Sequence, residues 1–300
     1  MSSSHPTVIV FGSGGLLGRH VVNEYARAGE PVLALSHGDL DVTSESSVIK
    51  LLDRENPSVV INCAALCHFQ GCEDHPELSE RVNLHAPVQL AGWTAERGIR
   101  LVHFSTDYIF DGNTNTPYRE GDAPRPLSVY GTHKAEVEAA FTVYSEQHLL
   151  LRVAWLFGKG GKTFLSMLPD LVMRQSRLEV ASGKRGSCLH VGYAAQVIRQ
   201  LLAQNTTGLL NLVHSGEASW EGFAHECLRQ LQARGYEPAC RDLIEVPMDK
   251  MPVLGGSRPI YSVLEVNKLA RELGTQPMEW QAGLSQFLDA TYPAGTPILA

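Results

Sequence analysis

The sequence lacks any apolar run close to the roughly 20 residues that a transmembrane helix needs. Its first six residues, MSSSHP, also lack the basic segment and the hydrophobic core of a secretory signal peptide. We therefore expect no membrane partner and a cytoplasmic location.

Cysteine is scarce as well. Six cysteines in 300 residues are too few for a disulfide-stabilised scaffold of this size, and they suit reduced cytosolic thiols. Three of them, Cys63, Cys67 and Cys72, lie near His68 and His75, but their spacing matches no zinc-binding pattern. We expect no metal site.

Positive charge is in deficit. The 25 Lys and Arg residues face 32 Asp and Glu residues, which gives a formal net charge of -7 and a pI near 5.9. This balance argues against a nucleic-acid-binding surface. The sequence also has no internal repeat and no low-complexity segment. A small-molecule partner fits these properties better.

What the sequence does contain is an alternation of short apolar runs with longer helical patterns. Hydrophobic residues make up 44% of the chain, enough for a large core in one elaborate α/β domain or in two domains that share a cleft. We predict a Rossmann-like, doubly wound parallel sheet with a smaller C-terminal substrate domain. The expected strands are residues 7–11, 31–35, 57–65, 100–105 and 149–154. The expected domains are residues 1–155 with about 190–213 for NAD(P) binding, and residues 156–189 and 214–292 for substrate binding.

A glycine-rich turn follows the first expected strand. The spacing of Gly12, Gly15 and Gly18 permits a tight turn, a close approach of the backbone to a pyrophosphate, and close helix packing. A glycine turn in isolation is more often an ordinary loop, but its place between a strand and a helix favours dinucleotide binding. The residues expected to bind the cofactor here are Gly12, Ser13, Gly15, Leu16 and Leu17.

The end of the second expected strand bears on the choice of cofactor. An NAD-preferring site usually has an acidic residue at this point, whereas Ser36 and His37 leave room for the 2′-phosphate of NADP(H). NADP(H) is therefore favoured, but Asp39 and Asp41 follow closely, so NAD(H) stays open. Arg19 also has two interpretations, a phosphate ligand or a solvated helix residue.

Two further segments are expected beside the cofactor. Asp41 and Val42 lie where an adenine would be, just before a helix whose predicted N-cap is Thr43. Small residues at the end of the third strand would let a cofactor lie flat across the carboxyl edge of the sheet. These small residues are Cys63, Ala64 and Ala65.

Three residues further along the chain fit the reduction of a ketone. Hydride transfer to carbon requires a proton donor that touches the oxygen, and Tyr130 is the candidate. Lys134 lies one helical turn later on the same face, where we expect its ammonium to lower the pKa of the phenol and to bond the cofactor ribose. Thr106, at a strand end, is expected to donate a second hydrogen bond to the carbonyl. An ordinary amphipathic helix would also explain a Tyr and a Lys at this spacing, but the glycine turn and the strand end favour catalysis.

Together these motifs resemble the extended short-chain dehydrogenase/reductase superfamily. The resemblance rests on the glycine turn, on NCAA at 62–65 and STDYIFDG at 105–112, and on Tyr130 with Lys134. Within the superfamily the chain resembles the dTDP-4-dehydrorhamnose reductase family over nearly its whole length. This implies an NAD(P)H-dependent oxidoreductase that reduces the 4-keto group of a dTDP-linked deoxysugar, with Thr106, Tyr130 and Lys134 at the catalytic positions.

The same resemblance suggests residues on the substrate side. It makes Arg258 a candidate phosphate ligand and Asp107 a candidate substrate contact. Tyr108 and Trp155 either stack on a sugar or base, or serve as core aromatic residues that need no ligand.

The chain departs from the family pattern at 69–73 (FQGCE) and at 183–189 (GKRGSCL). Both segments lie near the substrate in that family, so the sugar and the nucleotide stay open. Lys184 and Arg185, in the second segment, either clamp a diphosphate or are solvated.

Two alternative functions also stay open. The first half of the chain resembles the regulatory β subunit of methionine adenosyltransferase almost as well, which would make this a non-catalytic NADP-binding protein. The other alternative is a different sugar-nucleotide reductase, epimerase or natural-product ketoreductase of the same fold. A homodimer is compatible with the sequence, which does not fix the oligomeric state.

Overall fold

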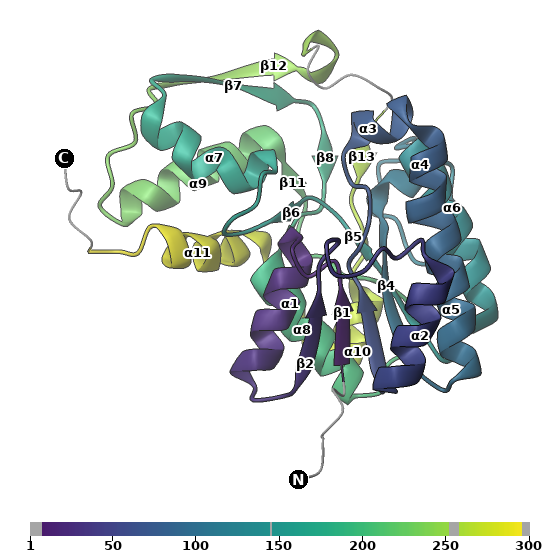
Figure 1. Cartoon of the computed structure of the whole chain (residues 1–300). Helices are drawn as coiled ribbons and strands as arrows, with labels where there is room; N and C mark the ends of the chain where they lie inside the picture. The colour runs from purple at the N-terminus through teal and green to yellow at the C-terminus, as the bar shows by residue number, and fades with distance from the viewer. Residues whose placement is uncertain (1–7, 145, 252–257, 296–300) are drawn as a thin grey trace.

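The computed structural model of the chain describes residues 8–144, 146–251 and 258–295. Its centre is a six-stranded sheet with the order β10-β5-β4-β3-β1-β2, in which every neighbouring pair is parallel (Figure 1). The predicted Rossmann-like α/β fold is thus confirmed. The strands are β1 (Val8–Phe11), β2 (Val32–Leu35), β3 (Val59–Asn62), β4 (Arg100–Thr106), β5 (Leu149–Val153) and β10 (Gly208–Asn211).

Helices cover both faces of the sheet, and the alternation of side chains along the strands explains why. In β1, Val8 and Val10 join the hydrophobic cluster on one face, while Ile9 and Phe11 join the cluster on the other. Because both faces of β1 are buried, this strand is apolar throughout. The helices on the first face are α1 (Leu16–Arg27) and α8 (Val191–Ala203), and those on the second are α2 (Glu45–Glu55), α5 (Ala86–Glu96) and α6 (Val129–Phe141).

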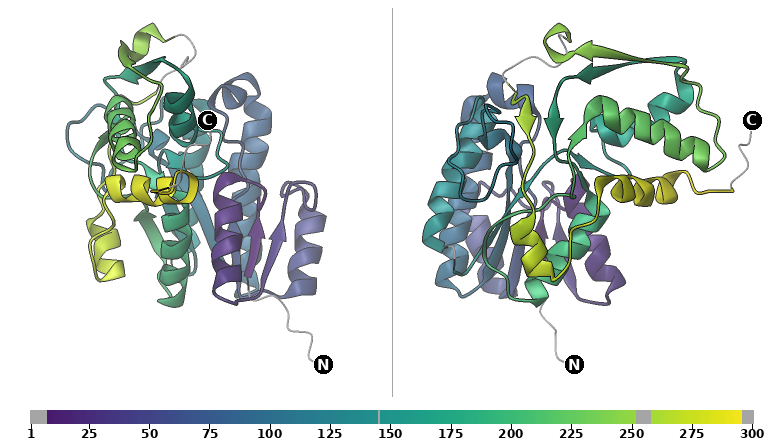
Figure 2. Two further views of the ribbon diagram at one scale, coloured as in Figure 1. Left: turned by 90° about the vertical axis from the view of Figure 1, so that its left-hand side faces the viewer. Right: turned by 180° about the vertical axis from the view of Figure 1, so that it is seen from behind.

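A second group of elements lies over the carboxyl ends of the sheet strands (Figures 1 and 2). Its apolar side chains form a separate hydrophobic cluster that includes Phe157, Phe223 and Phe287. The carboxyl edge of the sheet therefore faces a second layer. This layer contains α7 (Phe164–Arg174), α9 (Trp220–Ala233) and α11 (Trp280–Thr291), together with the parallel pair β7 (Arg177–Ser182) and β12 (Asp242–Pro247).

Short strands bring distant segments together between the two groups. β8 (Arg185–Gly186) pairs with both β11 (Ala218–Ser219) and β13 (Tyr261–Ser262), and β6 (Leu156–Phe157) pairs with β9 (Leu189–His190). The other α-helices of the described residues are α3 (Phe69–Asp74), α4 (Pro76–Glu80) and α10 (Asn267–Leu273). Within the described ranges, no helix combines the length and the apolar character that crossing a membrane requires.

The helix boundaries predicted from the sequence are partly right. Thr43 is not the N-cap of α2, because its amide and hydroxyl both donate to Asp41 Oδ1, at 2.9 and 2.8 Å, and the helix begins only after Ser44. A π-helical turn, Arg81–His85, lies between α4 and α5 in the helical stretch after residue 76. Ser219 caps α9 as predicted, accepting the Gly222 N–H at 3.0 Å.

Candidate functional site

A cavity of about 620 Å³ lies at the carboxyl edge of the sheet. One side of it comes from the start of α1, the ends of β3, β4 and β5, and α6, and the second layer contributes Phe164 and Trp220. Most residues predicted for cofactor, catalysis or substrate line this one space. They are Gly15, Leu16, Leu17, Cys63, Ala64, Ala65, Thr106, Asp107, Tyr108, Tyr130, Lys134, Trp155 and Arg258. The predicted cofactor residues outside its wall are Gly12, Ser13, Ser36, Asp41 and Val42.

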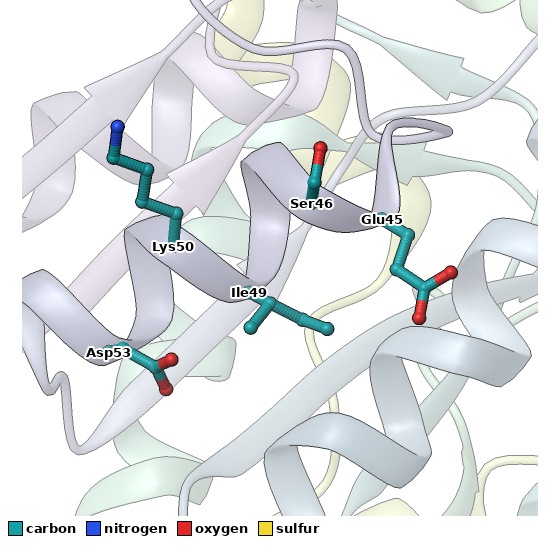
Figure 3. A pocket seen from close by; sticks show the side chains of 5 residues that line it. All are labelled: Glu45, Ser46, Ile49, Lys50 and Asp53. Atoms are coloured by element: carbon teal, nitrogen blue, oxygen red, sulfur yellow. The ribbon is translucent and has the colours of Figure 1, made fainter.

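A second hollow, of about 740 Å³, lies on the outer face of α2 (Figure 3). All the side chains that line it belong to that one helix: Glu45, Ser46, Ile49, Lys50 and Asp53. A single helix face cannot enclose a ligand, so the cavity at the sheet edge is the candidate site.

The glycine turn packs tightly against the end of β3. Gly12 has a φ of +69°, and a Cβ there would lie 2.6 Å from the Ala64 amide nitrogen. A Cβ at Gly18 would lie 2.3 Å from the Gly12 carbonyl oxygen. The N-cap of α1 is Gly15, which provides no side-chain cap, so the first amides of this helix remain for an anionic ligand. The turn therefore fits a pyrophosphate.

The end of β2 holds a carboxylate that the sequence only suggested. Ser36 donates from its N–H at 2.9 Å and from its hydroxyl at 2.6 Å to Asp39 Oδ2, and the hydroxyl bond in particular lowers the pKa of Asp39. This pair lies beside the glycine turn, since a Cβ on Gly14 would be 3.8 Å from Ser36 Cβ. Asp39 thus occupies the N–H and the hydroxyl of Ser36, a residue predicted to bind the cofactor. The nearby Val42 packs against the hydrophobic cluster beneath α2.

Tyr130 is the second residue of α6, whose N-cap Ser128 accepts the Gly131 N–H at 3.1 Å. Its ring meets that of Tyr108 edge-on, with centroids 6.2 Å apart. Part of the ring reaches the cavity, yet burial raises the pKa of Tyr130 well above its usual value. The phenol is therefore a neutral proton donor at physiological pH.

Lys134 lines the same cavity as Tyr130, and its ammonium is bound to β4. Its Nζ donates to the Phe104 carbonyl oxygen at 2.9 Å and lies 3.5 Å from His103 Nε2. Burial lowers the pKa of Lys134 to about 8. The expected lowering of the Tyr130 pKa is not found, because burial raises the pKa of the phenol and the Lys134 ammonium is bound to β4.

Thr106, the last residue of β4, begins a chain of buried polar groups. Its Oγ1 accepts the Tyr108 N–H at 3.3 Å and lies 3.2 Å from Asp107 Oδ1. The other carboxyl oxygen of Asp107 accepts the Ser262 hydroxyl at 2.7 Å. Burial raises the pKa of Asp107, and the positive charge of Lys184 opposes this effect.

The two segments that depart from the family pattern meet at Tyr108. The Phe69 ring lies edge-on to the Tyr108 ring, with centroids 5.9 Å apart, and Lys184 Nζ lies 4.7 Å from the centroid of the same ring. The Arg258 guanidinium lies over Phe69, at 4.6 Å. Both departures therefore alter the surroundings of one aromatic residue on the cavity wall.

The basic residues whose roles the sequence did not decide make different contacts in the structure. Lys184 is fully buried, and its Nζ has no hydrogen-bond partner within the described ranges. Arg185 is exposed and pairs with Glu217, so the two residues do not form a joint diphosphate clamp. Arg19 donates to the Gly160 carbonyl oxygen at 3.0 Å, which ties α1 to the loop after β6.

Sequence reasoning missed several cavity residues, among them His103, Phe164 and Trp220. Trp220 lies edge-on to Trp155, with centroids 5.9 Å apart. Phe164 and Trp220 directly follow Thr163 and Ser219, the N-caps of α7 and α9. The capping pattern in the sequence could therefore have located both residues at helix starts. His103 carried no comparable signal.

Comparisons with known proteins show the family of the chain. Residues 6–292 match the family described as the RmlD substrate binding domain. The chain is 33% identical to the dTDP-4-keto-6-deoxy-D-glucose reductase of Streptomyces niveus, over 93% of this chain and 95% of that protein. It is 31% identical to a dTDP-4-dehydrorhamnose reductase of Streptomyces griseus, over 98% and 97% of the two chains.

A solved structure is similar over the same extent. The dTDP-4-dehydrorhamnose reductase of Bacillus anthracis in complex with NADP has a TM-score of 0.85 to this chain, at 25% identity, and the match covers 94% of this chain and 98% of that one. Fold and sequence therefore agree, and the chain belongs to the RmlD substrate-binding family.

Proposed function

We propose that this protein is an NAD(P)H-dependent reductase that acts on the 4-keto group of a 4-keto-6-deoxy sugar nucleotide, most simply a dTDP-linked one. The observation that carries the proposal is that Thr106, Tyr130 and Lys134 line one cavity beside the glycine turn. The names of the Streptomyces relatives support the substrate class.

The cavity suits a dinucleotide, whose reduced nicotinamide supplies the hydride. The glycine turn and the uncapped start of α1 would hold the pyrophosphate, with Ser13, Leu16 and Leu17 beside it. Residues 63–65 would lie against the cofactor at the end of β3. Residues 36, 41 and 42 would lie toward the adenosine. NADP(H) is favoured because the Bacillus anthracis relative holds NADP, and NAD(H) remains second because of Asp39.

In this mechanism Tyr130 delivers the proton to the substrate oxygen while hydride reaches the carbon. The high pKa of Tyr130 keeps the proton on the phenol until the oxygen gains negative charge. Thr106 holds the same oxygen. Lys134 lines the same cavity, and we propose that its ammonium, charged below a pKa of about 8, bonds the cofactor ribose.

The substrate would occupy the end of the cavity nearest the second layer. Tyr108 and Trp155 offer aromatic faces to a sugar or base, and Arg258 offers a guanidinium to a phosphate. Arg258 Nε has no partner within the described residues, which supports this role.

The proposal includes a domain organisation in which different parts of the chain bind the cofactor and the substrate. Residues 1–155 with about 190–213 would bind the cofactor, and residues 156–189 and 214–292 the substrate. Their separate hydrophobic clusters support this division. A cytoplasmic location is part of the proposal, supported by six free cysteine thiols.

A panel of 4-keto-6-deoxy sugar nucleotides, followed by the loss of reduced-nicotinamide absorbance, tests the proposal. We expect turnover of at least one dTDP-linked member. Replacement of Tyr130 by Phe should lower kcat at least about 10²-fold, as the loss of a general acid does, with cofactor affinity nearly unchanged. An unaltered rate would remove Tyr130 from the mechanism. Tight NADP binding without any turnover, with co-purification of a synthetase, would support a regulatory subunit instead.

A further inference from the structure

We propose that Asp107 is a positioning residue that works as an un-ionised carboxylic acid and, by donating to Thr106 Oγ1, turns the Thr106 proton toward the substrate oxygen. This rests on the proposed reductase function, and it goes beyond a simple substrate contact for Asp107.

The hydrogen-bonding capacity of the Thr106 hydroxyl leads to this conclusion. A threonine hydroxyl has one proton and two lone pairs. One lone pair of Thr106 Oγ1 accepts the Tyr108 N–H at 3.3 Å, and Asp107 Oδ1 lies 3.2 Å away. If Asp107 is a carboxylate, only Thr106 can supply the proton between these two oxygens, and Thr106 then has none for a ketone.

An un-ionised Asp107 reverses that bond. Its hydroxyl proton then occupies the second lone pair of Thr106 Oγ1, while its other oxygen still accepts from Ser262 at 2.7 Å. Both lone pairs of Thr106 Oγ1 are then occupied, and the Thr106 proton is free for the cavity. No proton leaves Asp107 in the reaction, since the substrate oxygen takes its proton from Tyr130 and its carbon takes the hydride.

The surroundings of Asp107 suit the acid form. The residue is 2% exposed, and burial disfavours its charge. The titratable groups that interact with it are Lys184, Tyr108 and Tyr130, and Arg258 acts in turn on Lys184 and Tyr108. The cation that acts on it, Lys184, lies over the Tyr108 ring and makes no hydrogen bond within the described chain, so Asp107 lacks a direct ionic partner there.

Variants at position 107 separate this role from a structural one. In Asp107→Asn the amide oxygen can accept from Ser262 while the amide nitrogen donates to Thr106, as the acid would. Asp107→Leu can do neither, so its kcat should fall about 10²-fold, as for a lost oxyanion donor, and match that of Thr106→Val. Asp107→Asn should stay within about tenfold of wild type. Asp111→Asn, outside the cavity, is the matched control, and thermal unfolding checks that each variant is folded.

Infrared difference spectroscopy of wild type against Asp107→Asn reads the protonation state directly. We expect the C=O band of a carboxylic acid at neutral pH, and Lys184→Met should extend this band to higher pH by removing a cation that favours the carboxylate. A carboxylate band at neutral pH, or an Asp107→Asn variant as impaired as Asp107→Leu, would overturn the inference. If wild type reduces none of the sugar nucleotides, the proposed function fails while the infrared result still decides the state of Asp107.

Discussion

Replacing Glu138 by Gln should both destabilise the protein and slow turnover, because Glu138 anchors the helix that carries Tyr130 and Lys134. Glu138 lies one turn after Lys134 on α6. It accepts two bonds from Arg152 of β5, at 2.9 Å from Nε and 2.7 Å from Nη2. The Arg152 and Glu138 side chains are 2% and 6% exposed, so solvent cannot replace the lost charge.

The expected magnitude follows from that burial. Breaking a buried pair by removing one charge costs about 3–5 kcal/mol, because the other charge stays buried without compensation. Gln keeps the shape and one acceptor, and Arg152 keeps its bond to the Arg119 carbonyl oxygen at 3.0 Å, so we expect the lower end, about 3 kcal/mol. The control is Glu226→Gln, whose partner Arg229 is 66% exposed and where about 1 kcal/mol or less is expected.

Urea unfolding followed by tryptophan fluorescence measures both variants, and steady-state kinetics measures kcat. In Glu138→Gln, kcat should fall with little change in the KM for the nucleotide sugar, because the proton donor moves rather than the substrate contacts. Replacing Glu138 and Arg152 together by Leu should recover much of the stability, since no charge is then stranded. A loss in Glu138→Gln no larger than in Glu226→Gln would refute the reasoning.

Three further predictions follow from single features. Gly18→Ala should weaken dinucleotide binding about tenfold or more, because its Cβ would lie 2.3 Å from the Gly12 carbonyl oxygen, whereas Gly121→Ala meets no atom within 4 Å and should bind normally in a fluorescence titration. Asp39→Ala frees both Ser36 donors, so the ratio of NADPH to NADH affinity should rise about tenfold, and an unchanged ratio would contradict this role. Lys184 is fully buried and its pKa is lowered from 10.5 to about 8, so the unfolded chain binds the extra proton between these values and stability should rise with pH across them. Lys184→Met should remove this dependence of stability on pH and raise the free energy of unfolding by roughly 3 kcal/mol at pH 7. An unchanged dependence would show that Lys184 is not desolvated in solution.

The sequence predicted those structural features that neighbouring residues determine. Short apolar runs predicted β1 to β5 of the central sheet but not β10, and β1 is buried on both faces as expected. The spacing of four residues between Tyr130 and Lys134 predicted one helix, and α6 carries both. Thr43 shows the limit of local reasoning. Its hydroxyl could cap α2, but the N–H and the hydroxyl of Thr43 both donate to the Asp41 carboxylate instead.

Contacts between distant segments lay beyond such reasoning. Lys184 is buried because β8 pairs with β11 and β13, strands more than 30 residues away that carry no obvious pairing signal. The Lys134 ammonium binds the Phe104 carbonyl oxygen through packing of α6 on β4. Neither contact follows from residue types and spacing.

Protonation states depend on those same distant contacts. From the sequence, Lys134 was expected to make Tyr130 more acidic, but burial dominates and raises the pKa of the phenol instead. The same desolvation lowers the pKa of Lys134 and raises that of Asp107. Burial thus favours the protonated phenol of Tyr130 and opposes ionisation of Asp107, the two groups that would each direct a proton toward the site of the ketone. A residue pattern can name these groups, but only the packed fold determines which of them hold their protons.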